Sequence, residues 1–150
     1  MEPKRRLRIF LDSNVLFAAL YSSSGAQRII LSHVIDGKLK LVISEQVLEE
    51  IVRTVKDKLP DALADLRKLL VSILLEITED QGPEDVAKWT EMIDTGDAGI
   101  LAAAVAAQPD YLITGDRHFF ENPGIADKSG LEILTPVQFL ECWMEDAEKS

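Results

Sequence analysis

Short apolar runs alternate with helical patterns along the whole chain, and this alternation restricts the fold more than any other feature. Four runs have the length and apolar character of buried strands; they are residues 7–11, 39–43, 111–114 and 131–134, with residues 72–78 as a candidate edge strand. The segments between them are long enough for right-handed crossovers that contain a helix. The pattern therefore predicts an α/β fold of three layers, α/β/α, with a mostly parallel central sheet.

Apolar spacing and capping residues place the helices between these runs. Ser44 is suited to cap a helix that continues to about residue 57, and Thr135 opens a capping box before the last helix. Further helices are predicted over residues 15–21, from 29 to just before Gly37, from Pro60 onward, over 82–93, and from 97 to near Pro109. Residues 115–130 are predicted to form a loop.

The length of 150 residues fits one domain spanning residues 1–150. No apolar run approaches the length that crosses a membrane, and the run after the basic N-terminus is too short for a signal peptide. We therefore expect a cytoplasmic protein. Cys142 is the only cysteine, so no internal disulfide can form, and its neighbours Phe139 and Trp143 predict a buried thiol without a catalytic role.

The formal net charge of −10 argues against a nucleic-acid partner, because phosphate is bound mainly by Lys and Arg. The objection is incomplete, since acids that bind divalent cations make a site attractive to phosphate. Basic residues also remain at Lys4, Arg5, Arg6 and Arg8, and further along at Arg28, Lys38, Lys40, Arg53, Lys56 and Lys58. The simpler interpretation of each one is a solvated surface charge.

The chain has 26 Asp and Glu residues, and a few of them stand out because of their positions. Asp12 directly follows the first apolar run, Asp116 follows the third after a short turn, and Asp97 opens an alanine-rich helix. One of Glu49 and Glu50 is the fourth candidate; helical periodicity does not choose between them, because both flank the apolar stripe of their helix. Ligands of open α/β sheets bind outside the carboxyl ends of the strands, where two of these acids are expected.

Each acid also has a simpler role, since Asp12 and Asp97 are suited to cap helices and Asp116 to a turn. Those roles are independent of one another, whereas a metal site needs the acids together. Two carboxylates about 4 Å apart repel by roughly 4 kcal/mol at an effective dielectric constant near 20, so a cluster needs a counter-charge. Mg²⁺ or Mn²⁺ suits oxygen ligands, and two histidines and one cysteine do not supply a zinc site.

Five segments, in their order and spacing, resemble the PIN-domain nucleases, which include the VapC-type toxins of toxin–antitoxin pairs. They are residues 9–16, 43–51, 97–104, 112–116 and 133–136, which together extend over nearly the whole chain. The resemblance implies the PIN-like form of the α/β/α fold. It also implies hydrolysis of phosphodiester bonds in RNA with one or two Mg²⁺ or Mn²⁺ ions. The implied partners are an RNA substrate, an antitoxin protein and a second copy of the chain in a homodimer.

The family pattern selects Glu50 over Glu49, because its helix acid falls six residues after the Ser that ends the second strand. The implied catalytic and metal-binding residues are therefore Asp12, Glu50, Asp97 and Asp116. The three aspartates would hold metal, and the glutamate would bind metal or position the attacking water.

Four further positions match polar positions of the family. Ser13, Asn14 and Thr114 would support the acids or contact substrate, although capping and turn roles are the simpler interpretation. His118 stands where many relatives carry another acid. Contact with a phosphate and covering of the pocket rim are both open to it, and we favour the rim.

Other chemistries also place an Asp after the first strand, but the sequence lacks the partners that they need. A phosphatase with an Asp nucleophile wants a second acid two residues later, where Asn14 stands, and a receiver domain wants a late strand-end Lys, where Leu134 and Thr135 stand. The remaining alternative is a catalytically inactive PIN-like module that binds RNA or protein. Retention of all four acids favours the enzyme.

Overall fold

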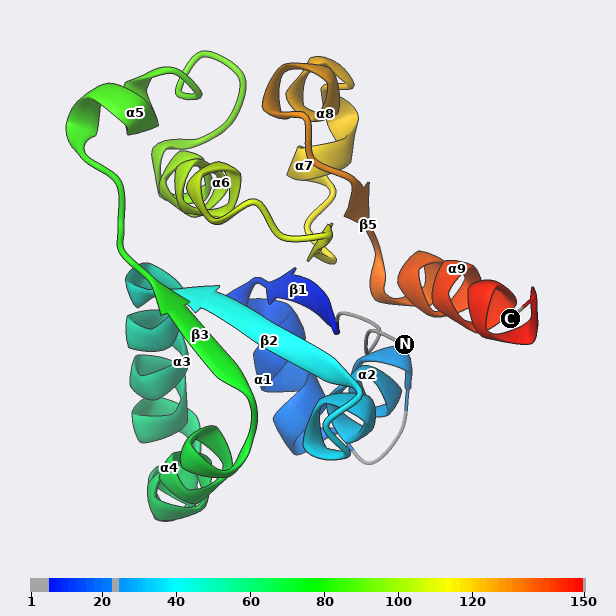
Figure 1. The fold of residues 1–150 in the computed structure, drawn as a ribbon. Helices are drawn as coiled ribbons and strands as arrows, with labels where there is room; N and C mark the ends of the chain where they lie inside the picture. The colour runs from blue at the N-terminus through cyan, green and yellow to red at the C-terminus, as the bar shows by residue number, and fades with distance from the viewer. Residues whose placement is uncertain (1–5, 23–24, 150) are drawn as a thin grey trace.

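The computed structural model describes residues 6–22 and 25–149, and five strands in this part of the chain form one sheet (Figure 1). They are β1 (Leu7–Leu11), β2 (Leu39–Ser44), β3 (Leu75–Thr78), β4 (Tyr111–Ile113) and β5 (Ile133–Leu134). The order is β3-β2-β1-β4-β5, and each pairing is parallel. The predicted parallel sheet is confirmed, and β3 is the edge strand expected within residues 72–78.

Helices cover both faces of the sheet, which confirms the three layers (Figure 1). One face carries α1 (Ser13–Tyr21), α2 (Ala26–Ile35), α3 (Glu45–Lys58) and α4 (Leu63–Ser72), with a 3-10 turn at Pro60–Ala62. The other carries α5 (Pro83–Ala87), α6 (Thr95–Ala107), α7 (His118–Glu121) and α8 (Gly124–Ser129). Right-handed crossovers explain the change of face, because the chain moves from β1 to β3 and then returns across the sheet to β4 and β5. The last helix, α9 (Pro136–Lys149), packs against α2.

The predicted caps hold the ends of α3 and α9. Ser44 Oγ accepts a hydrogen bond from the Val47 amide at 3.2 Å. Thr135 and Gln138 exchange two hydrogen bonds, of 2.9 and 3.2 Å, which form the capping box. Gly37, just past the end of α2, has a φ of 77°, a left-handed conformation that glycine adopts without steric cost.

The centre of the sheet and α6 form much of the core. In β1, Ile9, Phe10 and Leu11 are fully buried. The buried residues of α6 are Ala98, Ile100, Leu101, Ala102, Ala103 and Ala104, and their mostly small side chains let the helix lie close against β2. Within residues 6–22 and 25–149, no helix combines the length and the apolar character needed to cross a membrane.

β1 is the central strand, with β2 on one side and β4 on the other. Leu11 pairs with Ile113, and the Asp12 amide donates to the Ile113 carbonyl at 3.4 Å. Because the connections that follow β1 and β4 lie on opposite faces of the sheet, the carboxyl ends of these two strands border a crevice. Asp12 and Thr114 are the first residues after the two strands, so the topology places both at this crevice.

Two predicted segments differ from the structure. α5 ends at Ala87, and residues 88–93 continue as tight turns in which the Met92 amide donates to the Trp89 carbonyl. The apolar spacing of this segment reports the burial of Trp89 and Ile93 and not a continuous helix. Residues 115–130, predicted as a loop, contain α7 and α8, because Phe119 and Ile125 are buried and anchor two short helices.

The thiol of Cys142 is exposed, so the prediction that it is buried is wrong. In α9, Phe139 and Leu140 are buried and Trp143 packs against His33 of α2. At about 100° per residue, Cys142 lies roughly 110° from the middle of this buried arc, which turns the thiol toward solvent.

Candidate metal centre

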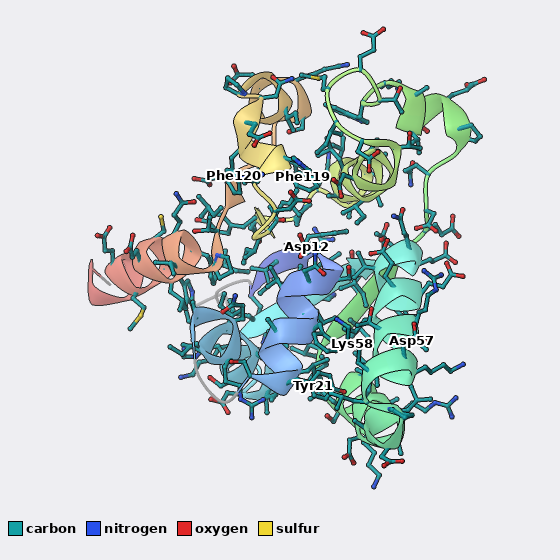
Figure 2. The ribbon with its side chains drawn as sticks, turned by 180° about the vertical axis from the view of Figure 1, so that it is seen from behind. Asp12, Tyr21, Asp57, Lys58, Phe119 and Phe120 are labelled. Carbon is teal, nitrogen blue, oxygen red and sulfur yellow. The ribbon has the colours of Figure 1, made fainter. Side chains whose placement is uncertain are left out.

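Asp12 lies between the carboxyl end of β1 and the start of α1, and 5% of its surface is exposed. This end of α1 points toward α6 and α7 (Figure 2). The Asp12 carboxylate accepts a hydrogen bond from the Val15 amide at 3.0 Å, which caps α1, and a short one from the Thr114 hydroxyl. Burial raises the pKa of this carboxyl; the two hydrogen bonds oppose the rise, and the charges of Asp116 and Glu50 add to it. Asp12 is thus a helix cap that also faces two other acids.

Glu50 reaches the same crevice from α3. Its carboxylate accepts hydrogen bonds from the Ser13 hydroxyl at 2.7 Å and from the Gln46 side-chain amide at 3.1 Å. Since Ser13 follows Asp12 directly, the first bond ties Glu50 to the end of β1. Glu49 lines a separate groove between α3 and β3. Helical periodicity does not choose between Glu49 and Glu50, but in the structure Glu50 contacts the residue after Asp12 and Glu49 lies elsewhere.

Gln46 links this part of α3 to the start of α6. Its side-chain nitrogen also donates to the Gly96 carbonyl, at 3.0 Å, in the residue before Asp97. A Cβ atom at Gly99 would come within 2.5 Å of Gln46 Oε1. Glycine at position 99 therefore permits the close approach through which Gln46 holds Glu50 and the beginning of α6 together.

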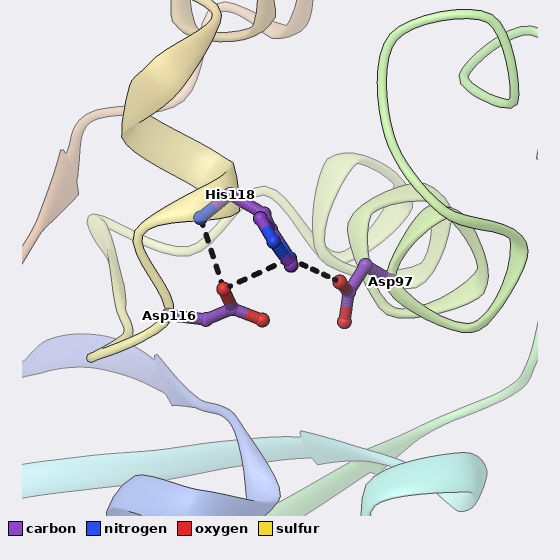
Figure 3. Close-up of side chains that lie close together, drawn as sticks. All are labelled: Asp97, Asp116 and His118. Carbon is purple, nitrogen blue, oxygen red and sulfur yellow. Dashed lines mark hydrogen bonds and ion pairs between the residues drawn. The ribbon is translucent and has the colours of Figure 1, made fainter.

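Asp97, Asp116 and His118 meet across the crevice, from the first turn of α6 and the segment after β4 (Figure 3). One ligand atom from each lies within 4.8 Å of the others. His118 Nδ1 is 3.3 Å from Asp116 Oδ1 and 3.8 Å from Asp97 Oδ2, and the His118 amide donates to Asp116 Oδ1 at 2.9 Å. Burial, followed by the charges of Asp116 and Asp94, raises the pKa of Asp97 to about 6, against the opposing effect of His118.

Hydrogen bonds and charge interactions thus connect all four predicted acids. Thr114 Oγ1, which bonds Asp12, also accepts from the Asp116 amide at 3.0 Å. Burial is the main cause of the raised pKa values of Asp12 and Asp97, and the charges of neighbouring acids add to both rises. Asp97, Asp116 and His118 offer ligand atoms within 4.8 Å of one another, a group that does not include Asp12 or Glu50. Carboxylate oxygens gathered in this way fit a divalent cation such as Mg²⁺ or Mn²⁺.

Asn14 and Thr114 both lie near Asp116. Asn14 lines a pocket of 210 Å³ together with Gln27, Gly115 and Asp116. Thr114 is fully buried beneath Asp12 and Asp116 and orients both. The positions of the two residues agree with the support and substrate-contact roles that the sequence suggests, and the roles themselves stay predictions.

Residues 8–118 of the sequence match the PIN-domain family. The chain belongs to that family. The matched span covers more than half of the chain and contains all four acids. No curated protein matches the sequence.

The PIN domain shares its fold with solved structures of VapC-type toxins. The VapBC2 structure from Rickettsia felis, bound to a promoter DNA fragment, is 18% identical with a TM-score of 0.62, over 86% of this chain and 98% of that one. A toxin–antitoxin complex from Klebsiella pneumoniae is 22% identical with a TM-score of 0.61, over 85% and 97%. VapC20 from Mycobacterium tuberculosis, a sarcin-ricin loop cleaving toxin, is 17% identical with a TM-score of 0.57, over 77% and 95%. The PIN-like fold class is confirmed.

The sequence also carries signals, weaker than those of the four acids, for Gln46, Gly99 and His118 of this PIN-domain site. Gln46 stands four residues before Glu50, a helical spacing that brings side chains together, and the isolated Gly99 in α6 signals a close approach. His118 is predicted to cover the rim but contacts both Asp97 and Asp116. Its place two residues after Asp116, in a turn, is the local signal that would have suggested the contact with Asp116.

Replacing Asp97 with Asn should stabilise the metal-free PIN domain near neutral pH. The pKa of Asp97 is about 6 in the folded chain against 3.8 for the free group, so the folded state binds more protons and loses stability as the pH rises from about 4 to about 6. We expect Asp97→Asn to exceed the wild type in free energy of unfolding by on the order of 1 kcal/mol at about pH 7.5. Urea unfolding in EDTA measures the difference, which should shrink toward pH 4; a difference that does not change with pH would contradict it.

Proposed function

We propose that this PIN domain is a divalent-metal-dependent ribonuclease whose catalytic residues are Asp12, Glu50, Asp97 and Asp116. The supporting observation is their convergence, from four separate elements, at the crevice between the ends of β1 and β4. Helix capping explains single carboxylates, but it gives no reason for four of them to share one place. Membership of the PIN-domain family and the fold of VapC20, a toxin that cleaves the sarcin-ricin loop, support nuclease chemistry.

The three aspartates would hold one or two Mg²⁺ or Mn²⁺ ions, and His118 offers a ligand atom within 4.8 Å of those of Asp97 and Asp116. When bound, such an ion acts as a Lewis acid toward the scissile phosphate and activates water for attack. Side chains of Asp97 and Asp116 are 21% and 26% exposed, so the crevice is open to a strand that lies across it. We also propose that the enzyme cuts within an RNA chain, which is endonuclease activity.

The chain's own hydrogen bonds orient the reacting groups. Thr114 and the Val15 amide fix the Asp12 carboxylate, and Ser13 and Gln46 fix that of Glu50. Held in this way, Glu50 binds metal or accepts a proton from the attacking water as a general base. The hydrolysis needs no nucleophile from the protein.

We also propose that the chain is the toxin of a toxin–antitoxin pair. The Rickettsia felis and Klebsiella pneumoniae structures that share its fold come from VapBC or toxin–antitoxin complexes. A net charge of −10 favours an antitoxin that presents a basic segment. An antitoxin of this kind would be recovered with the chain after co-expression, and added salt would weaken the complex.

A homodimer is the oligomeric state that we expect, because the family resemblance implies a second copy as partner. Light scattering of the purified protein should give twice the chain mass of 16.7 kDa. A single species of 16.7 kDa at working concentration would remove the proposal.

Single-stranded RNA should be cut in the presence of Mg²⁺ or Mn²⁺ and left intact in EDTA. Asp12→Asn and Asp97→Asn should each lower the cleavage rate by roughly 100-fold or more, because each removes a charge that holds the metal over the phosphate. The rate is measured on a fluorescent RNA under single-turnover conditions.

The matched control for this assay is Asp57→Asn, the same chemical change on the exposed end of α3, away from the crevice (Figure 2). It should cut at the wild-type rate. Activity that survives both site substitutions would exclude the four-acid nuclease.

Metal binding should also raise the thermal midpoint of the wild-type protein. An ion at 100 times its dissociation constant adds about 2.7 kcal/mol to stability when it binds only the folded state. Asp97→Asn should lose most of this gain, and Asp57→Asn should keep it. A wild-type midpoint that neither Mg²⁺ nor Mn²⁺ changes would favour the inactive RNA- or protein-binding module.

A further inference from the structure

A pocket of 340 Å³ adjoins the acidic crevice and shares His118 with it. Two segments build it: the turns that precede α6, and α7 with the residue that follows. We call it the side pocket; its lining residues are Met92, Ile93, Asp94, His118, Glu121 and Asn122. Figure 3 shows His118 at the start of α7, close to both Asp97 and Asp116. Because His118 also lines the side pocket, the pocket adjoins the acidic site.

The side pocket joins an apolar wall to polar groups that mostly accept hydrogen bonds. Ile93 is buried and Met92 half-buried, and the Met thioether packs favourably against flat aromatic groups. Asp94 and Glu121 add two carboxylates, which repel phosphate. A ligand that suits these walls has a flat apolar face and several hydrogen-bond donors on its edge. In a single-stranded RNA that ligand is a base, since unpaired bases are bound through their faces and their Watson–Crick edges.

The polar groups select among the four bases. The Asp94 side chain makes no capping hydrogen bond to α6, and the Glu121 carboxylate makes an exposed contact through Oε1 with Arg117 Nε at 3.5 Å. Asn122 Oδ1 accepts a hydrogen bond from the Gly124 amide at 3.0 Å. This bond occupies the amide oxygen, so the NH₂ group is the part of the Asn122 side chain that can contact a ligand. Guanine presents two adjacent donors, N1–H and the N2 amino group, beside the acceptor O6. Adenine and cytosine each present a single amino donor beside a ring acceptor, and uracil presents one donor between two acceptors, so none of them offers two adjacent donor groups to carboxylates.

A second pocket lies beside Asp116, the neighbour of His118 in the acidic site. The Asn14 pocket described above includes Asp116, whereas the side pocket includes His118, and these two side chains are 3.3 Å apart. An RNA strand with its phosphate near Asp116 and His118 would therefore have a pocket beside each of these two residues. We propose that the side pocket binds an unpaired guanine of the RNA substrate next to the scissile phosphate, an inference that rests on the proposed ribonuclease function.

The test compares cleavage of oligouridine with cleavage of the same RNA carrying one guanosine at successive positions, in Mn²⁺. Wild type should favour one fixed position of the guanosine relative to the cut, by about tenfold over uridine, as expected for a two-point contact to a base. Replacing that guanosine with inosine, which lacks the N2 amino group, should lower the rate several-fold. Glu121→Gln should reduce the ratio of guanosine to uridine rates by about fivefold or more, because the amide keeps one acceptor oxygen and replaces the other with an NH₂ group that cannot accept from guanine.

Asn122→Ala should reduce the same ratio and serves as the second variant, since it removes the donor expected to face O6. The matched control is Glu141→Gln, the same change on an exposed position of α9, which should keep the wild-type ratio. Asp97-dependent cleavage with no base preference, or with a preference that neither Glu121→Gln nor Asn122→Ala reduces, overturns the side-pocket proposal alone. Absence of metal-dependent cleavage of every RNA overturns the proposed function and this inference with it.

Discussion

The parallel pairing of β1 with β4 is the constraint on which the rest of the site depends. Leu11 lies opposite Ile113, so the residues that follow, Asp12 and Thr114, come out side by side at the edge of the sheet. The Thr114 hydroxyl then bonds both Asp12 and the Asp116 backbone, which fixes two of the acids with one side chain. A slip of one residue in this register would turn Asp12 to the other face and separate it from Thr114.

The other two acids arrive through packing between helices. Glu50 is held by Ser13 and Gln46, and Gln46 fits between α3 and α6 because position 99 is a glycine. The small side chains of α6 let it lie close to β2, which brings Asp97 at its first turn over the crevice. Burial, with the charges of neighbouring carboxylates adding to it, raises the pKa values of Asp12 and Asp97, so keeping both ionised here is costly until a cation or a proton enters.

Local patterns predict the elements that carry their own signals, such as the parallel strands, the Ser44 cap and the capping box at Thr135. The same patterns place Asp12 and Asp116 after strands, because the end of an apolar run is visible in the sequence. They fail where a neighbour from elsewhere in the chain decides the outcome. The exposure of Cys142 depends on which arc of α9 meets α2, and the contact of His118 with Asp97 depends on how α7 sits beside α6.

The basic residues near the N-terminus do not resolve the difficulty that an acidic chain has in binding RNA. Arg8 and Lys40 both pair with Glu76, and Arg6 donates to the Gly37 carbonyl; Lys4 and Arg5 lie outside the described residues. Arg8 and Lys40 stand toward the amino ends of β1 and β2, opposite the end where the acids gather. In the proposed ribonuclease, attraction of phosphate to the crevice would come from cations held by the acids, which invert the local field. Under that proposal the carboxylates that give the chain its unfavourable charge would also be the means by which RNA is bound.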